Sequence, residues 1–185
     1  NGLEKVEAGT PVEIRWRSAG LTETQPVLLV NTGGGATGRW QGDSYQTGGG
    51  STYSFGNPVD LSGVTDPAPE TVYQSYVNSV AGPGAGFGYR LPVRDGDYTV
   101  RLHFAEPSYT TAGSRVMDIR LQGQLAADDF DVGAAAGGRY RATALSFDVT
   151  ASGGGGILVE LTNGTYYGAL LAGIEILAVN PEGVA

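Results

Sequence analysis

Apolar and polar residues alternate most regularly in the middle of the chain, from Phe87 to Leu121. Three runs there carry an apolar side chain at every second position: Phe87 to Val93, Tyr98 to Phe104 and Met117 to Leu121. Successive side chains of a β-strand point to opposite faces, so each run predicts a strand with one buried face. Asp95-Gly96 favours a tight turn, and we expect the first two strands to pair as a hairpin. Pro92 lacks an N–H, which predicts a sheet edge or a bulge there.

Similar short runs recur along the rest of the chain, between turns rich in Gly, Pro and Asn. They lie at 11–17, 27–30, 145–149, 157–161 and 170–179, and the run at 27–30 is apolar throughout, as in a strand buried on both faces. No segment of the chain shows a sustained helical period, and the sequence contains no visible internal repeat. About eight to ten short strands predict an all-β fold, either a β-sandwich or a jelly roll.

Five ordered blocks resemble the malectin family of carbohydrate-binding β-sandwich modules. They are LLVNTGG (28–34), VYQSY (72–76), YRLPVRDGDYTVRLHFAEPSYTTAGSRVMDI (89–119), FDVGAAAGG (130–138) and LAGIEIL (171–177). The resemblance spans nearly the whole chain and implies a malectin-like sandwich of the galactose-binding-domain type. We expect one such domain at 26–180, preceded by a leading strand or linker at 1–25 that could end an earlier domain, and followed by a linker at 181–185.

Composition and charge exclude several classes of partner. The net charge of −8 argues against nucleic acid, whose phosphates require clustered Lys and Arg, and against anionic membranes. There is no cysteine, so disulfides and thiolate metal sites are excluded. The sequence contains no apolar run long enough to cross a bilayer, and we expect no membrane insertion.

Catalytic and cofactor motifs are weak. Gly33 to Gly38 matches the glycine spacing of a dinucleotide loop, but the glycines that follow predict no helix to hold a pyrophosphate, so a turn is favoured. His103 is the sole histidine and is interpreted as structural. Asp128, Asp129 and Asp131 are weak candidates for calcium ligands, with a solvated acidic turn as the favoured reading. We therefore expect no cofactor, and a paired-carboxylate glycosidase is the least favoured function.

Aromatic residues in polar loops are the most informative chemical feature. Seven lie in Gly-, Ser- or Thr-rich stretches: Trp40, Tyr45, Tyr53, Tyr76, Tyr109, Tyr166 and Tyr167. A sugar ring offers an apolar C–H face and a rim of hydroxyls, which flat aromatic rings with polar tips can bind. About half of these rings are expected to be structural, as are Tyr73 and Tyr89.

The malectin resemblance implies which residues form the sugar site, at loops on one end of the sandwich. It places Trp40 and Tyr109 at aromatic positions, with Tyr76 nearby and Asn78 where another aromatic often occurs. Ser108 replaces an aromatic, and Tyr167 stands where an acid often precedes the last strand. We expect Trp40 and Tyr109 to stack on sugar faces, and Asp43, Asn78 and Tyr167 to hydrogen-bond hydroxyls.

The sequence therefore predicts a non-catalytic module that binds a poly- or oligosaccharide. The expected setting is a larger secreted enzyme or cell-surface protein of bacterial origin, with neighbouring domains as partners. Because Ser108 and Tyr167 depart from the family pattern, a structural or adhesive spacer with an eroded sugar site is the alternative.

Overall fold

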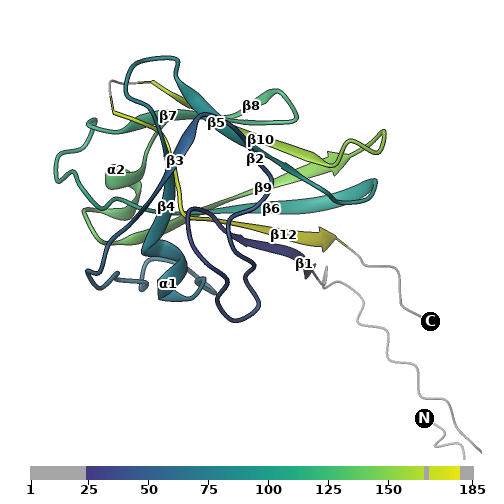
Figure 1. The fold of residues 1–185 in the computed structure, drawn as a ribbon, viewed down its shortest axis with the longest axis horizontal. Coiled ribbons are helices and arrows are strands. Elements are labelled where there is room, and N and C mark those ends of the chain that lie inside the picture. Colours follow the sequence, from purple (N-terminus) through teal and green to yellow (C-terminus); the bar gives the residue numbers. More distant parts are fainter. Residues whose placement is uncertain (1–23, 165–166, 180–185) are drawn as a thin grey trace, which may run out of the picture.

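The structure is a computed structural model of the chain and describes residues 24–164 and 167–179 (Figure 1). Strands predominate, and the helices are α1 (Glu70–Tyr73) and α2 (Val132–Ala136). The strands are β1 (Thr24–Asn31), β2 (Gln46–Gly48), β3 (Gly50–Ser54), β4 (Ser75–Ser79), β5 (Gly86–Leu91), β6 (Gly96–Ala105), β7 (Val116–Leu121), β8 (Gln124–Asp131), β9 (Ala142–Ala151), β10 (Ile157–Asn163), β11 (Leu170–Leu171) and β12 (Gly173–Val179). No helix among the described residues is long and apolar enough to cross a membrane.

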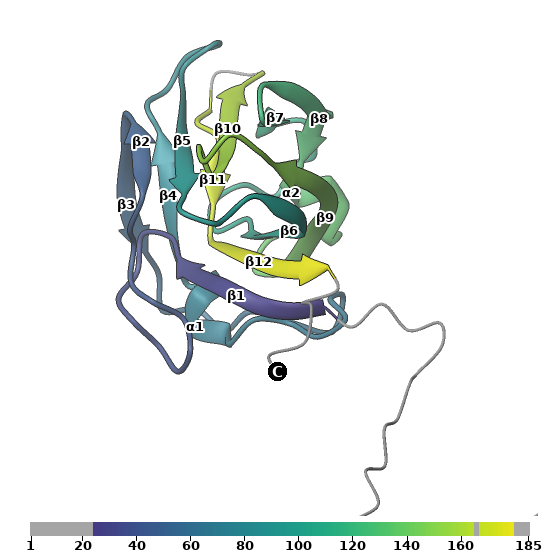
Figure 2. The same cartoon turned by 90° about the vertical axis from the view of Figure 1, so that its right-hand side faces the viewer.

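Two antiparallel sheets form the layers of a β-sandwich, which confirms the predicted all-β fold. One has the strand order β1-β12-β6-β9 and the other β2-β5-β10-β7-β8. A smaller sheet, β11-β4-β3, lies beside β2 and β5 (Figure 2). Thr24 at the start of β1 pairs with Val179 at the end of β12, so the described chain enters and leaves the sandwich side by side.

The central segment forms the three predicted strands, but the predicted hairpin is wrong. β5 and β7 belong to the five-stranded sheet, whereas β6 between them belongs to the facing sheet. All three apolar faces are buried because the chain crosses from sheet to sheet, which lets these faces pack against one another. Asp95 fixes the crossing by accepting hydrogen bonds from the N–H groups of Gly153 and Gly154, at 3.0 and 2.8 Å. Pro92 follows the last residue of β5, a central strand, and therefore does not mark a sheet edge.

The main hydrophobic core lies between the two large sheets. Its fully buried side chains include Tyr89, Leu91, Leu102, Phe104, Met117, Ile119, Ile157, Leu161 and Ile174. The burial of Tyr73 and Tyr89 confirms that both rings are structural. The alternation at 157–161 is also confirmed, since Ile157, Val159 and Leu161 are all buried.

Other local predictions differ from the structure. The run at 27–30 lies in β1, an edge strand, and the Val27 side chain is 51% exposed, so this strand is not buried on both faces. The acidic segment near Phe130 is part of β8 rather than a turn. The predicted strand at 11–17, with the rest of 1–23 and 180–185, lies outside the described residues.

A second, smaller core covers the outer face of β6 under α1. It contains Trp40, Tyr73 and their apolar neighbours, and His103 lies among them with no exposed surface. The Trp40 and Tyr73 rings contact the imidazole edge-on, with centroids 5.4 and 5.6 Å away. A side chain at Gly173 would have its Cβ 2.7 Å from Cγ1 of Val72 and 3.0 Å from Cζ3 of Trp40, so glycine is required there.

The same cluster makes stability sensitive to acid. The Tyr73 phenol lies 2.9 Å from Nδ1 of His103, and Nε2 lies 3.5 Å from a carboxylate oxygen of Glu175. Burial lowers the pKa of His103, an effect to which the Arg101 charge adds and which Glu175 opposes. The folded protein therefore resists protonation of this ring, whereas the unfolded chain accepts a proton near pH 6.5.

We expect the free energy of unfolding to fall as the pH drops below 6.5 and to fall less in His103→Gln. Urea unfolding between pH 5 and 7.5 measures this difference. This pH range excludes the titration of Glu175. The pKa of Glu175 is lowered, so its contribution to stability is lost only at more acidic pH. Parallel pH profiles for the wild type and the variant would contradict the assignment.

Candidate functional site

A buried ion pair closes the base of the loop between β6 and β7. Nε of Arg115 donates to Oε2 of Glu106 at 2.6 Å, and the two residues are only 4% and 1% exposed. The other carboxylate oxygen accepts the backbone N–H groups of Ser108 and Tyr109 at 2.8 and 3.0 Å. The loop that carries Tyr109 is therefore fixed by charge-assisted hydrogen bonds at both of its ends.

Arg115 also joins this loop to two other segments. Its NH1 group donates to Oδ1 of Asn78 in β4 at 2.6 Å and to the carbonyl oxygen of Gly168, just before β11. Three segments far apart in the sequence thus meet around one guanidinium. Because a buried cation must be paired and hydrogen-bonded, the arrangement of these segments is strongly constrained.

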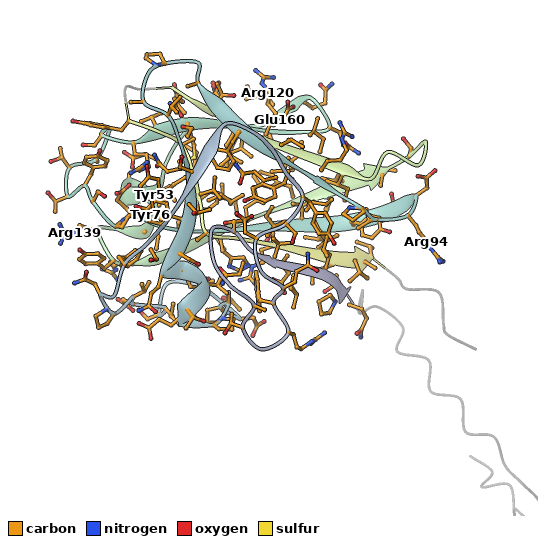
Figure 3. The ribbon with its side chains drawn as sticks, in the orientation of Figure 1. Tyr53, Tyr76, Arg94, Arg120, Arg139 and Glu160 are labelled. Carbon is orange, nitrogen blue, oxygen red and sulfur yellow. The ribbon has the colours of Figure 1, made fainter. Side chains whose placement is uncertain are left out.

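Aromatic rings gather on the surface above this ion pair. The Tyr109 and Tyr167 rings lie against each other with centroids 4.2 Å apart, and the Arg115 guanidinium carbon lies 5.1 Å from the Tyr109 centroid. Tyr53 on β3 is paired with Tyr76 on β4, and their rings stack at 5.6 Å (Figure 3).

Tyr76 and Asn78 share the outer face of β4, because the residues between and beside them, such as Val77, are buried. We call the set Tyr53, Tyr76, Asn78, Tyr109 and Tyr167 the aromatic face. Tyr53 is 51% and Tyr167 40% exposed, while the other members are half-buried.

The phenols of Tyr76 and Tyr109 are held in their neutral form. Partial burial is the main cause that raises the pKa of both Tyr76 and Tyr109, and the Arg115 charge opposes it in each case. Charges on Glu106 and Arg115 act on both phenols, which places the two rings over the same ion pair. At neutral pH each hydroxyl therefore keeps a proton to donate to a ligand oxygen.

Of the residues expected in the sugar site, the structure brings four together and separates two. Tyr76, Asn78, Tyr109 and Tyr167 belong to the aromatic face. Trp40 is 6% exposed and packs against His103, which contradicts its expected role on a sugar face. The Asp43 carboxylate accepts a hydrogen bond from the hydroxyl of buried Tyr89 at 2.8 Å, so it is bound to a side chain of the core.

Two contributors escaped the sequence reasoning. Tyr53 was recognisable as a loop aromatic, but only the β3–β4 register places it beside Tyr76. Arg115 gave no signal, because a lone arginine before a strand resembles any solvated residue. Phe55 and Tyr140 extend the aromatic surface, with centroids 5.5 Å apart, and Arg139 lies over the Tyr140 ring at 4.2 Å.

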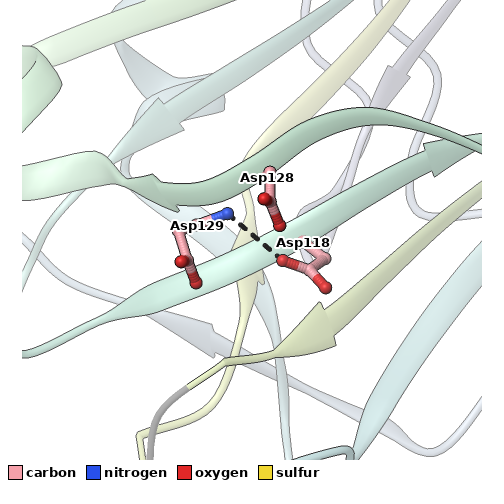
Figure 4. A group of neighbouring side chains, drawn as sticks. All are labelled: Asp118, Asp128 and Asp129. Carbon is pink, nitrogen blue, oxygen red and sulfur yellow. Dashed lines mark hydrogen bonds between the residues drawn. The ribbon is translucent and has the colours of Figure 1, made fainter.

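The acidic residues of β8 are not members of the aromatic face, although Asp131 accepts the backbone N–H of Gly113 in the loop that carries Tyr109. Asp128 and Asp129 come together with Asp118 of β7, with oxygen atoms within 4.8 Å of one another (Figure 4). Asp131 is not a member, because its carboxylate caps α2 through the Ala134 N–H at 3.0 Å. Exposed carboxylates gather without an ion, so this geometry alone defines no calcium site.

Comparison with known proteins identifies the family. The model of the Malectin domain matches residues 27–174. A receptor-like protein kinase of Arabidopsis thaliana is 31% identical over 216 aligned residues, which cover 97% of this chain and 26% of the kinase. Malectin of Homo sapiens is 38% identical over 47 residues, or 25% of this chain and 16% of malectin. These relatives are plant and animal proteins, which contradicts the expected bacterial origin.

Solved structures share the fold. The plant receptor-like kinase FER superposes with a TM-score of 0.70 at 25% identity, covering 86% of this chain and 50% of that one. The receptor-like kinase ANX2 gives 0.71 at 21% identity over 86% and 49% of the two chains. FER has also been solved in complex with the peptide RALF23 and LLG2. The present chain thus spans about half the length of these structures and about a quarter or less of the curated relatives.

We expect Glu106→Gln to lower the free energy of unfolding by about 3 kcal/mol, because it leaves the Arg115 charge buried without a counter-ion. The double variant Glu106→Gln/Arg115→Met should regain part of this loss, since it removes the orphaned charge. Urea denaturation of the wild type, both single variants and the double variant gives the coupling energy. Additive losses would show that the two side chains stabilise the loop independently.

Proposed function

The chain belongs to the malectin domain family, and on this premise we propose that it is a non-catalytic module that binds carbohydrate at the aromatic face. The observation that carries the proposal is the convergence of Tyr53, Tyr76, Tyr109 and Tyr167 on one exposed surface. Exposed aromatic rings cost free energy in water, so a cluster held in place by a buried ion pair favours a role in binding.

The chemistry of this surface suits a neutral sugar. The Tyr109 and Tyr167 rings offer apolar area to the C–H face of a pyranose, and Tyr53 extends that area. The neutral phenols of Tyr76 and Tyr109 donate to sugar oxygens. A shallow hollow of ≈ 500 Å³ adjoins the face at Phe55 and gives a longer oligosaccharide room to extend.

Hydrolysis is disfavoured at this surface. The charge of the Glu106 carboxylate acts on Tyr109, and both of its oxygens are occupied by Arg115 and by two backbone N–H groups. A general acid needs a free carboxyl group at the scissile bond, which this pairing does not provide. The module therefore holds its ligand without cleaving it.

The proposed setting is the extracellular part of a larger cell-surface or secreted protein. Similarity to the extracellular domains of plant receptor-like kinases supports this setting. In that setting the module would be joined to other domains of the same polypeptide. A structural spacer with an eroded sugar site is the alternative, and Ser108 in place of an aromatic favours it.

We expect Tyr167→Ala to weaken oligosaccharide binding about thirtyfold, the loss of ~2 kcal/mol that is typical of a central aromatic contact. Tyr45→Ala is the matched control, because Tyr45 is equally exposed at 40% but lines a hollow near Gly154 to Gly156, at the far end of β10 from Tyr167. Calorimetric titration of gluco-, xylo- and galacto-oligosaccharides measures both variants.

Equal affinities for Tyr167→Ala and the wild type would remove Tyr167 from the site. If the wild-type protein binds no sugar on a broad glycan array, the spacer alternative is the better account.

Trp40→Ala is expected to act differently from both tyrosine variants. It should destabilise the fold by about 3 kcal/mol, because it opens a cavity beside His103.

A further inference from the structure

The free edges of the sheets differ in how well they are protected. An edge strand exposes unpaired backbone N–H and C=O groups, and natural proteins guard such strands with proline, bulges, charges or short length. Among the described strands, β1 has Pro26 and a register shift between Pro26 and Leu28. β2 has three residues, β11 has two and β3 has five. β8 has two irregularities in its pairing and carries three aspartates.

β9 is an edge strand without these protections beyond its first residue, Ala142, whose N–H donates to the carbonyl oxygen of Asp60 at 2.9 Å. It runs for ten residues, Ala142–Ala151, and pairs with β6 in an unbroken register. Its sequence, ATALSFDVTA, contains no proline and no cationic residue, and Asp148 is its one charge. This strand is long, regular and rich in residues that favour β-structure, so its free edge is suited to accept another strand.

The core beneath this edge is incompletely covered. Leu145, Phe147 and Val149 point inward against the main core yet remain partly exposed, whereas their partners on β6 are buried. A hollow of ≈ 400 Å³ opens between β9 and β8, and apolar surface predominates in it. Its lining residues are Leu121, Gln122, Gln124, Ala126 and Phe147 to Thr150. Gln122 lies at the end of β7 opposite the Tyr109 loop, so this hollow is separate from the aromatic face.

We propose that the free edge of β9 is a docking site for an extended basic peptide segment, which adds to the sheet as a further antiparallel strand. Alternate apolar side chains of the peptide cover Phe147 and Val149. The intervening side chains face solvent beside Asp148, the one charged residue among the described residues that line the hollow. Cationic residues at those positions complement Asp148 and the net charge of −8 of the chain.

Charge also decides against a second copy of the chain as the occupant. Two chains of net charge −8 repel each other, and pairing β9 with itself brings two copies of Asp148 close together. A basic peptide gains attraction from the same charges.

The test uses a short synthetic peptide in which Lys and Val alternate, with both ends blocked. Calorimetry should show saturable binding to the wild-type protein, and NMR titration should shift backbone amide signals of β9. A Glu/Val peptide of equal length tests the charge. A Lys/Val peptide with N-methylated alternate amides tests the strand hydrogen bonds. Both control peptides are expected to bind at least tenfold more weakly.

Two protein variants locate the contact. Asp148→Lys reverses the charge in the hollow, and Val149→Lys places a cation where the added strand would lie. Each variant should bind the Lys/Val peptide at least tenfold more weakly than the wild type, while circular dichroism shows an unchanged fold. Val27→Lys is the matched control, since Val27 is exposed on β1, the guarded edge of the same sheet, and its affinity should equal that of the wild type.

Absence of binding by the Lys/Val peptide, or equal binding of the N-methylated peptide, would overturn the proposal. Equal binding of the Glu/Val peptide would overturn its charge argument. Sedimentation that shows a dimer disrupted by Val149→Lys would assign the edge to a second copy instead. None of these outcomes depends on the sugar site, because Tyr167 lies outside the hollow.

Discussion

The buried ion pair of Glu106 and Arg115 determines where the aromatic rings of this protein lie. A guanidinium shielded from water needs a counter-ion and several acceptors, and here these come from the β6–β7 loop, from β4 and from the segment before β11. Satisfying one cation therefore draws together parts of the chain that are distant in sequence. Tyr109 lies in the β6–β7 loop and Tyr167 in the segment before β11, so their rings are brought together as well.

This dependence explains which features the sequence predicts and which it does not. Alternation identified the strands around Tyr89, Leu102 and Ile119, because a period of two follows from burial of one face alone. It could not reveal that successive strands lie in different sheets, since both arrangements bury the same residues. For the same reason an Asp-Gly pair looked like a hairpin turn where the chain crosses the sandwich.

The sequence predicted some residues of the candidate site but not which loop aromatics are exposed. The malectin resemblance and the polar surroundings pointed to Tyr76, Asn78, Tyr109 and Tyr167, which do lie on one face. Trp40 lies in an equally polar segment but is buried, because α1 and the outer face of β6 provide an apolar contact that local sequence does not show. Whether an aromatic ring in a loop is exposed depends on tertiary packing, and here Gly173 makes the room that Trp40 fills.

The central claim is that the ion pair builds a surface at which sugar binds. NMR titration with gluco-, xylo- and galacto-oligosaccharides, observing the tyrosine ring signals, tests it most directly. The account predicts that one of these sugars shifts the rings of Tyr109 and Tyr167 together while those of buried Tyr89 and distant Tyr45 stay unchanged. Shifts confined to Tyr45, or the absence of any ring shift at saturating sugar, would contradict it.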